Sequence, residues 1–193
     1  MIRRYAIPLV ALLILLPTAA LAQAKPREVN ITPDSAPGWL PSEGLERQAL
    51  DAMRAYFAAW ESGKADQAYA LMTPINREAL AYPDFQKMTA NFSSEAGTLV
   101  ERRVLKVTWT KDPPDAPSPG IYVAIDESAR YTGIARQCGY IVLFQAPVGG
   151  PFQVMRVENS FISDASAAKM APGEADAQWK KLSAVCPNYT PAG

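Results

Sequence analysis

Residues Gly120–Gln145 read GIYVAIDESARYTGIARQCGYIVLFQ, the composition of two long strands joined by a short turn. Apolar or aromatic side chains recur at alternate positions of the first half, namely Ile121, Val123, Ile125, Ala129 and Tyr131. A period of two places these side chains on one face of a strand. The segment therefore predicts the centre of an antiparallel sheet whose one face must be covered.

The segments able to cover that face lie upstream, because apolar residues recur at helical spacing within residues 45–72. Ser42 is the predicted N-cap of a helix of about five turns, and Ser62 and Gly63 end it. The apolar stripe of this helix consists of Leu45, Ala49, Ala52, Met53, Tyr56, Phe57 and Trp60. Shorter helical segments are predicted over residues 65–72, 76–80 and 84–92.

Two further segments have strand composition and lie on either side of the central pair. They are residues 99–109 and 152–161, and a closing helix is predicted over residues 174–185 with Trp179 and Leu182 directed inward. The predicted fold class is therefore α+β. It consists of N-terminal helices packed on an antiparallel sheet of about four strands, plus a short C-terminal helix.

The N-terminus has the pattern of a signal peptide. Arg3 and Arg4 provide the positive start, residues 6–16 the apolar core, and Ala20 and Ala22 a small-residue cleavage motif. We predict a signal peptide over residues 1–22, with cleavage after residue 24 as the alternative. The mature chain is then expected outside the cytoplasm, either periplasmic or extracellular.

A membrane anchor is the competing interpretation of this segment. The apolar run is shorter than the roughly 20 residues that a membrane span needs, and it contains Pro8 and Pro17. We therefore expect no membrane span in the mature chain. The remaining plan is an extended lead-in over residues 25–41, one domain over residues 42–186 and a tail over residues 187–193.

Charge and composition exclude several functions. Removing residues 1–22 takes away two arginines and no acidic residue, so 17 basic and 19 acidic residues remain. A near-neutral chain lacks the basic surface that nucleic-acid binding needs, and the pairs Arg102-Arg103 and Lys180-Lys181 are interpreted as solvated. The chain has no histidine, which removes Ser-His and Cys-His nucleophile pairs and the common zinc sites. No cofactor and no metal are predicted.

The two cysteines, Cys138 and Cys186, predict a disulfide, because an even count in an exported chain favours one. The bridge would tie a central strand to the C-terminal segment. Two unrelated buried thiols are the alternative. A redox-active pair is disfavoured because no C-x-x-C motif occurs.

Three segments carry a resemblance to known proteins: LDAMRAYFAAWESGKADQAYALM at residues 50–72, GIYVAIDESARY at 120–131 and GPFQVMRVENSFI at 150–162. In these the chain resembles the nuclear-transport-factor-2-like (cystatin-like) superfamily, and more narrowly the exported bacterial domains of unknown function of the 4019 type. The resemblance covers about residues 44–162 and implies a curved sheet that wraps helices into a cone. One departure is Phe152, where the family commonly has a tryptophan.

Glu127 is the most suggestive candidate residue, because it shares strand parity with Ile125 and Ala129. In a regular strand its carboxylate faces the covered side, where burial would raise its pKa and make it a candidate general base. Two structural alternatives are a bulge over residues 126–128 that turns it to solvent, or an ion pair with Arg130 or Arg156.

Cone folds that are enzymes, such as ketosteroid isomerase, place an acid and polar partners in a cavity beneath the sheet. By that resemblance the cavity or ligand-binding candidates are Tyr56, Trp60, Glu127, Tyr131, Tyr140 and Arg156. The helical spacing of Tyr56 and Trp60 also suits simple core packing. Arg156 and Glu158 equally suit a solvent-facing pair on a strand.

The function predicted from these observations is an uncharacterised exported domain that binds a small apolar ligand or a protein partner without catalysis. One alternative is a structural module that forms a homodimer through its sheet. The other is a cofactor-independent isomerase or dehydratase that uses a buried carboxylate, with Glu127 as the candidate.

Overall fold

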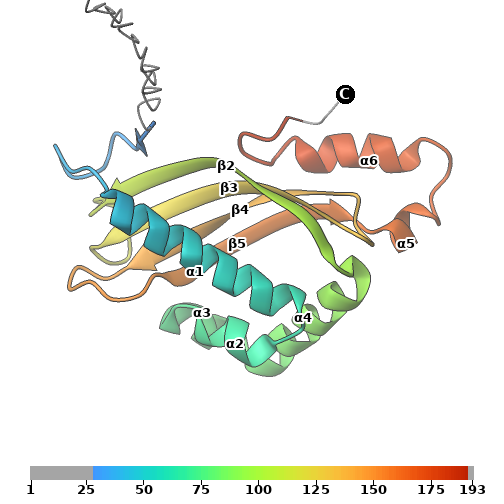
Figure 1. Ribbon diagram of the computed structural model, residues 1–193, viewed down its shortest axis with the longest axis horizontal. Coiled ribbons are helices and arrows are strands. Elements are labelled where there is room, and N and C mark those ends of the chain that lie inside the picture. The colour runs from blue at the N-terminus through green and yellow to red at the C-terminus, as the bar shows by residue number, and fades with distance from the viewer. Residues whose placement is uncertain (1–27, 191–193) are drawn as a thin grey trace, which may run out of the picture.

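The computed structural model describes residues 28–190 and contains one five-stranded sheet (Figure 1). The strands follow one another in the sheet in chain order, as β1 (Asn30–Ile31), β2 (Leu99–Lys111), β3 (Ile121–Tyr131), β4 (Arg136–Gln145) and β5 (Gln153–Ile162). All neighbours are antiparallel except β1 and β2, which are parallel. The α+β class is confirmed. The predicted signal peptide lies outside the described residues.

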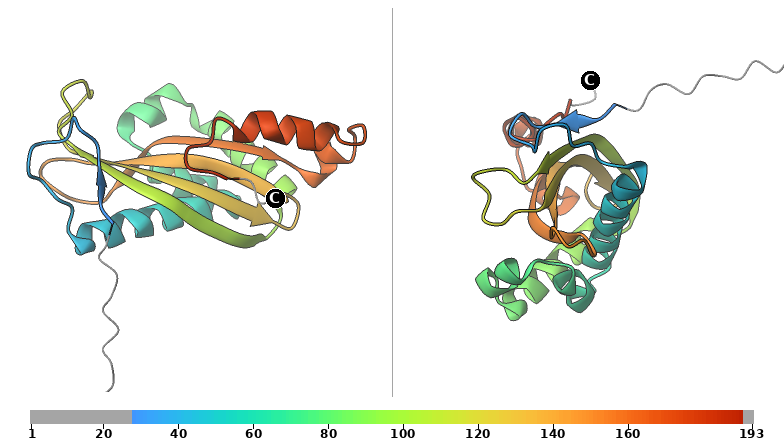
Figure 2. Two further views of the ribbon diagram at one scale, coloured as in Figure 1. Left: turned by 90° about the horizontal axis from the view of Figure 1, so that it is seen from above. Right: turned by 90° about the vertical axis from the view of Figure 1, so that its left-hand side faces the viewer.

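The sheet has one strand more than predicted, because β1 comes from the lead-in over residues 25–41. Two residues are too few to show a strand period, so only their pairing with Thr108 and Trp109 of β2 identifies them. The four longer strands lie where the alternation predicts them. Seen end-on, the sheet is strongly curved, with α1 along its concave side (Figure 2).

We call the concave side of the sheet the inner face and the opposite side the outer face. The register pairs Ile125 with Ile141 and Glu127 with Gly139, so these four residues belong to the inner face. Ile125, Glu127 and Ile141 are fully buried. Glu127 therefore keeps the strand parity that the sequence predicts, and the bulge over residues 126–128 is wrong. The irregularity beside Glu127 lies on the neighbouring strand instead, at Leu105, and a second one lies between Leu99 and Glu101.

Helix α1 (Glu43–Glu61) covers the inner face with an apolar stripe. The Ser42 side chain accepts a hydrogen bond from the Leu45 backbone N–H at 3.1 Å, which confirms the predicted N-cap. After Ser62, Gly63 has a φ of 70°, a left-handed conformation that glycine adopts without strain. The buried residues of this stripe are Ala49, Met53, Tyr56, Phe57 and Ala59.

Three more helices follow α1 and complete the cover of the inner face. These are α2 (Ala65–Ala70), α3 (Pro74–Ala79) and α4 (Tyr82–Ala96). Helix α4 begins two residues before the predicted start and ends four residues beyond the predicted end. Pro83 fits in its first turn because a first-turn residue needs no N–H donor.

The C-terminal segment lies on the outer face and includes α5 (Asp164–Ala167) and α6 (Glu174–Ser183) (Figures 1 and 2). Cys138 of β4 is bonded to Cys186, with 5.8 Å between their Cα atoms, so the predicted disulfide is confirmed. Trp179 is buried beside it, as predicted. The start of the expected tail also contacts the fold, because Asn188 donates a hydrogen bond to the Asp126 carboxylate.

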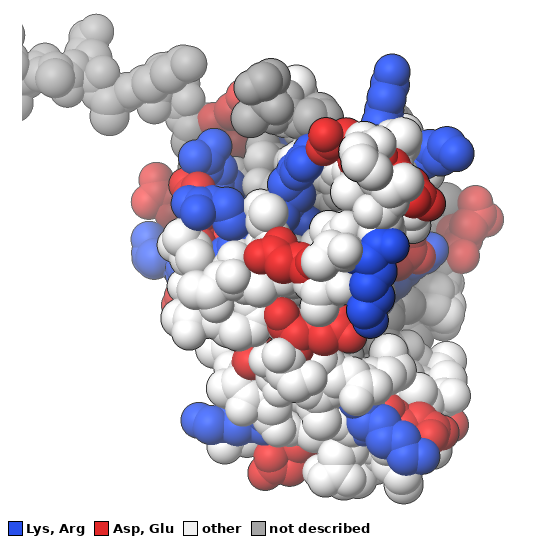
Figure 3. Space-filling model, turned by 90° about the vertical axis from the view of Figure 1, so that its right-hand side faces the viewer, with Lys and Arg blue, Asp and Glu red and all other residues white. Residues whose placement is uncertain are grey.

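The surface carries charges of both signs. At the end of the molecule shown in Figure 3, Lys and Arg side chains are interspersed with Asp and Glu. Within residues 28–190, none of the helices combines the length and the apolarity that crossing a membrane requires.

Candidate functional site

A cavity of about 530 Å³ lies between the helices and β5, the last strand of the sheet. Helices α1, α3 and α4 supply one wall, and β5 supplies most of the other. Gly139 and Tyr140 of β4 and residues 185–187 of the C-terminal segment complete the lining. Its aromatic lining consists of Tyr56, Phe57, Trp60, Phe85, Phe92, Tyr140 and Phe161. A cavity of this size and composition is typical of sites for small apolar molecules.

Trp60 is at the centre of the aromatic wall. Its ring is nearly parallel to that of Tyr56, at 18° and 6.3 Å between centroids. Phe85 meets it edge-on at 5.3 Å, and Phe92 lies at 5.9 Å from it. The helical stripe thus serves as core packing and as cavity wall at once, because Tyr56 and Trp60 both line the cavity.

Two sequence candidates, Tyr140 and Arg156, reach the cavity from the outer face. Arg156 forms an ion pair with Glu158, and its guanidinium lies 5.7 Å from the centroid of the Tyr140 ring. The side chain of Arg156 is 61% exposed, so this group is at the rim. Arg156 and Glu158 therefore form the solvent-facing pair on a strand that the sequence analysis gave as one interpretation.

Behind the cavity, a buried ionic cluster joins α1, β2 and β3. Arg102 donates to the Glu127 carboxylate from Nε at 3.0 Å and to Glu61 from Nη2 at 2.5 Å. The Tyr131 hydroxyl donates to Glu61 at 2.7 Å and accepts from Arg102 at 2.7 Å. The guanidinium also lies 3.8 Å from the centroid of the Phe57 ring. One arginine therefore holds two carboxylates and a tyrosine.

Two amide side chains complete this cluster on the side of Glu127. Gln137 donates from Nε2 to Oε1 of Glu127 at 3.1 Å. Asn159, with its amide nitrogen turned towards its acceptors, donates to the same oxygen at 3.2 Å. Asn159 also lines the cavity, whereas Glu127 does not. The amide of Asn159 is thus the group of this pair that is exposed to the cavity, and the Glu127 carboxylate is not.

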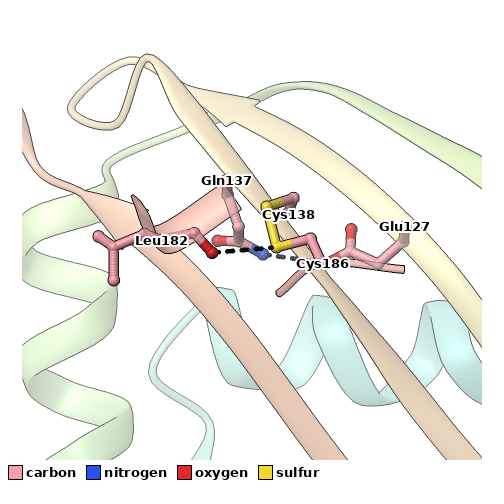
Figure 4. Close-up of a disulfide and its surroundings, with 5 residues drawn as sticks. All are labelled: Glu127, Gln137, Cys138, Leu182 and Cys186. Carbon is pink, nitrogen blue, oxygen red and sulfur yellow. Dashed lines mark hydrogen bonds between the residues drawn. A yellow bond between two sulfur atoms is a disulfide. The ribbon is translucent and has the colours of Figure 1, made fainter. Parts of the chain in front are cut away.

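Gly139 allows this close arrangement. A Cβ atom at this position would lie 2.0 Å from the Glu158 carbonyl oxygen and 2.4 Å from the Asn159 side chain. Any larger residue would separate β4 from β5 beside Glu127. Figure 4 shows that Gln137 lies next to the disulfide, so the cluster and the bridge share the same part of β4.

Burial sets the electrostatics of the cluster. It raises the pKa of the Glu127 carboxyl group, although Arg102 and the hydrogen bond from Gln137 act in the opposite direction. Burial acts against the charge on Arg102, but Glu127, Tyr131 and Glu61 outweigh it and raise the pKa of the guanidinium. Burial also raises the pKa of Tyr131, so its hydroxyl is neutral and donates.

The sequence candidates fall into three groups in space. Tyr56 and Trp60 line the cavity, Tyr140 and Arg156 stand at its rim, and Glu127 and Tyr131 belong to the buried cluster. The predicted partners of Glu127 are wrong. Arg130 lies near Glu101 at 4.0 Å, and Arg156 pairs with Glu158.

Arg102 is the residue that sequence reasoning missed. It was interpreted as solvated together with Arg103, yet its side chain is only 10% exposed, against 67% for Arg103. Adjacent residues of a strand point to opposite faces, so two neighbouring arginines cannot share one environment. That alternation was the available signal. Glu61 gave a similar signal. It follows Phe57 by one helical turn, and its side chain therefore lies on the same face of α1 as the apolar stripe.

The comparisons with known proteins give a family and no function. A family model described as a protein of unknown function (DUF4019) matches residues 52–156. Because the match spans more than half of the chain, this protein belongs to that family. No curated protein and no solved structure matches. The matched residues include Arg102 and Glu127, while Cys186 lies beyond them.

Replacing Glu127 by glutamine should change how stability depends on pH. A carboxyl group whose pKa is higher in the folded protein stabilises the fold most at low pH. That contribution is lost as pH rises from the ordinary glutamate value of 4.5 to the raised value. We expect the melting temperature of the wild type to fall relative to that of Glu127→Gln across this window.

The variant itself should fold, because the unpaired, buried Oε1 of Gln137 can accept from the new amide once the Gln137 side chain rotates. Thermal unfolding followed by circular dichroism from pH 4 to 8 measures the difference between the two proteins. A difference that stays constant over this range would contradict the raised pKa.

Proposed function

We propose that this domain is exported and binds a small, largely apolar molecule in the cavity between α1, α4 and β5. The cavity of about 530 Å³ with its aromatic lining carries this proposal, because the volume lies within the range of ligand sites. The proposed cone of the nuclear-transport-factor-2-like superfamily is consistent with it. The curved sheet, with α1 along its concave side, supports that assignment.

In this proposal Glu127 has a positioning role and not a catalytic one. A general base must reach the proton that it removes, directly or through one water. Glu127 is fully buried, is absent from the cavity lining and has its oxygens engaged by Arg102, Gln137 and Asn159. The cluster fixes the end of α1 against β2 and β3, and thereby the part of the cavity wall that contains Trp60.

Native mass spectrometry of protein exported to a bacterial periplasm, compared with the same sample after denaturation, tests the proposal. We expect a small molecule that is released on denaturation. A second, identical chain in the native spectrum would instead favour the homodimer. A mass that retains residues 1–22 would contradict the predicted cleavage.

Two matched variants locate the binding. Met88 lines the cavity and is 49% exposed, whereas Ile75, on the neighbouring helix, is 59% exposed and is outside the lining. Met88→Arg should weaken binding by about tenfold or more, equivalent to about 1.4 kcal/mol, because it places a charge against the ligand. Ile75→Arg should leave binding unchanged. Equal effects of the two substitutions would place the ligand elsewhere.

A further inference from the structure

Tyr56 carries a polar group that the protein itself does not use. The residue is 4% exposed and lines the cavity. Its hydroxyl makes no hydrogen bond with any other residue in the described part of the chain, and burial is the single cause that raises its pKa. The hydroxyl oxygen is not among the fully enclosed unpaired polar atoms of the described chain, so it remains accessible from the cavity. Such a group in a cavity wall points to a partner supplied by a ligand.

The two amide side chains of the cavity have protein partners. Asn76 donates to the carbonyl oxygens of Val154 and Met155, and Asn159 is engaged with Glu127. The charged residues among the described lining are Arg156 and Glu158, which pair with each other at the rim. The deep part of the cavity thus offers no free charge to balance an ionised ligand.

The shape of the cavity wall adds a second restriction. The rings of Tyr56 and Trp60 are nearly parallel, and Phe85 is edge-on to Trp60. Offset stacking and edge contacts of this kind suit a flat ring system. Tyr56 itself belongs to this wall, and at neutral pH its hydroxyl keeps its proton because its pKa is raised.

From these observations we infer that the ligand is a flat, uncharged, mainly aromatic or polycyclic molecule with a hydrogen-bond acceptor that the Tyr56 hydroxyl binds. This inference rests on the proposed function and names the ligand class of the same cavity. Tyr56 would then determine specificity between molecules of similar shape that have or lack the acceptor. The aromatic wall would supply most of the affinity.

Two probes of nearly the same shape test the inference. Acetonaphthone has a carbonyl acceptor, and isopropylnaphthalene has none. Binding to the wild type and to Tyr56→Phe is measured by quenching of tryptophan fluorescence. We expect the wild type to prefer acetonaphthone. The Tyr56→Phe variant should lose about threefold to tenfold in affinity for acetonaphthone alone, the range of one neutral hydrogen bond.

The controls separate the two proposals. Tyr56→Phe should be about as stable as the wild type in thermal unfolding, because the hydroxyl that it removes makes no hydrogen bond within the described chain and the ring is kept. If both probes bind and the variant binds them as the wild type does, the Tyr56 inference is overturned while the cavity stands. An equal loss of both probes also overturns it. If neither probe binds to the wild type, the proposed ligand site falls, and this inference with it.

Discussion

Arg102→Met should destabilise the protein by about 3–5 kcal/mol, the range for removing one partner of a buried ion pair. The substitution leaves the fully buried Glu127 and the 11% exposed Glu61 without their shared cation. It also removes the guanidinium from the ring of Phe57, although methionine keeps most of the apolar stem. Denaturant unfolding at neutral pH measures the loss.

Arg103→Met is the matched control, because it lies next to Arg102 and on the opposite face of β2. Its side chain is 67% exposed, and its partner Glu101 is 41% exposed. Exposed pairs contribute little to stability, so the unfolding midpoint should not change. Equal effects of the two substitutions would contradict the buried cluster.

A double variant shows whether the loss comes from the uncompensated carboxylate. In Arg102→Met/Glu127→Gln the second change removes the buried negative charge, so part of the lost stability should return. If the double variant instead loses the sum of the two single effects, Glu127 and Arg102 do not interact. The same cycle measures the free energy of coupling between them.

Loss of the disulfide should have a similarly large effect. The bridge closes a loop of 48 residues, for which loop-closure entropy in the unfolded chain predicts a stabilisation of about 4 kcal/mol at most. The variant Cys138→Ser/Cys186→Ser should lose up to this amount in oxidising buffer. The expected loss is smaller if hydroxyls replace the buried sulfurs with new hydrogen bonds.

Reductant provides the control for this prediction. The wild type should unfold at a lower denaturant concentration when reductant is present, whereas the double serine variant should unfold at the same concentration with and without it. A wild type that does not respond to reductant at any stage of unfolding would contradict the bridge. Because Trp179 is buried against the disulfide, its fluorescence should also report detachment of α6.

Local periodicity determined the elements of this fold. The period of two in residues 121–131 and the helical stripe from Leu45 to Trp60 depend on neighbours in sequence, so they could be predicted without knowing the rest of the chain. The buried position of Glu127 followed from the same parity. The disulfide followed from the count, because two cysteines allow one intramolecular pairing.

Only the tertiary structure decided which side chains meet. Glu61, Arg102 and Glu127 come from α1, β2 and β3, and their contact depends on the crossing of that helix and on the register between the two strands. A residue inserted at Leu105 shifts this register, and no local pattern marks it. The cavity likewise depends on how α4 packs beside β5. Periodicity fixes the face on which a side chain lies, but its partner is set by packing between elements distant in sequence.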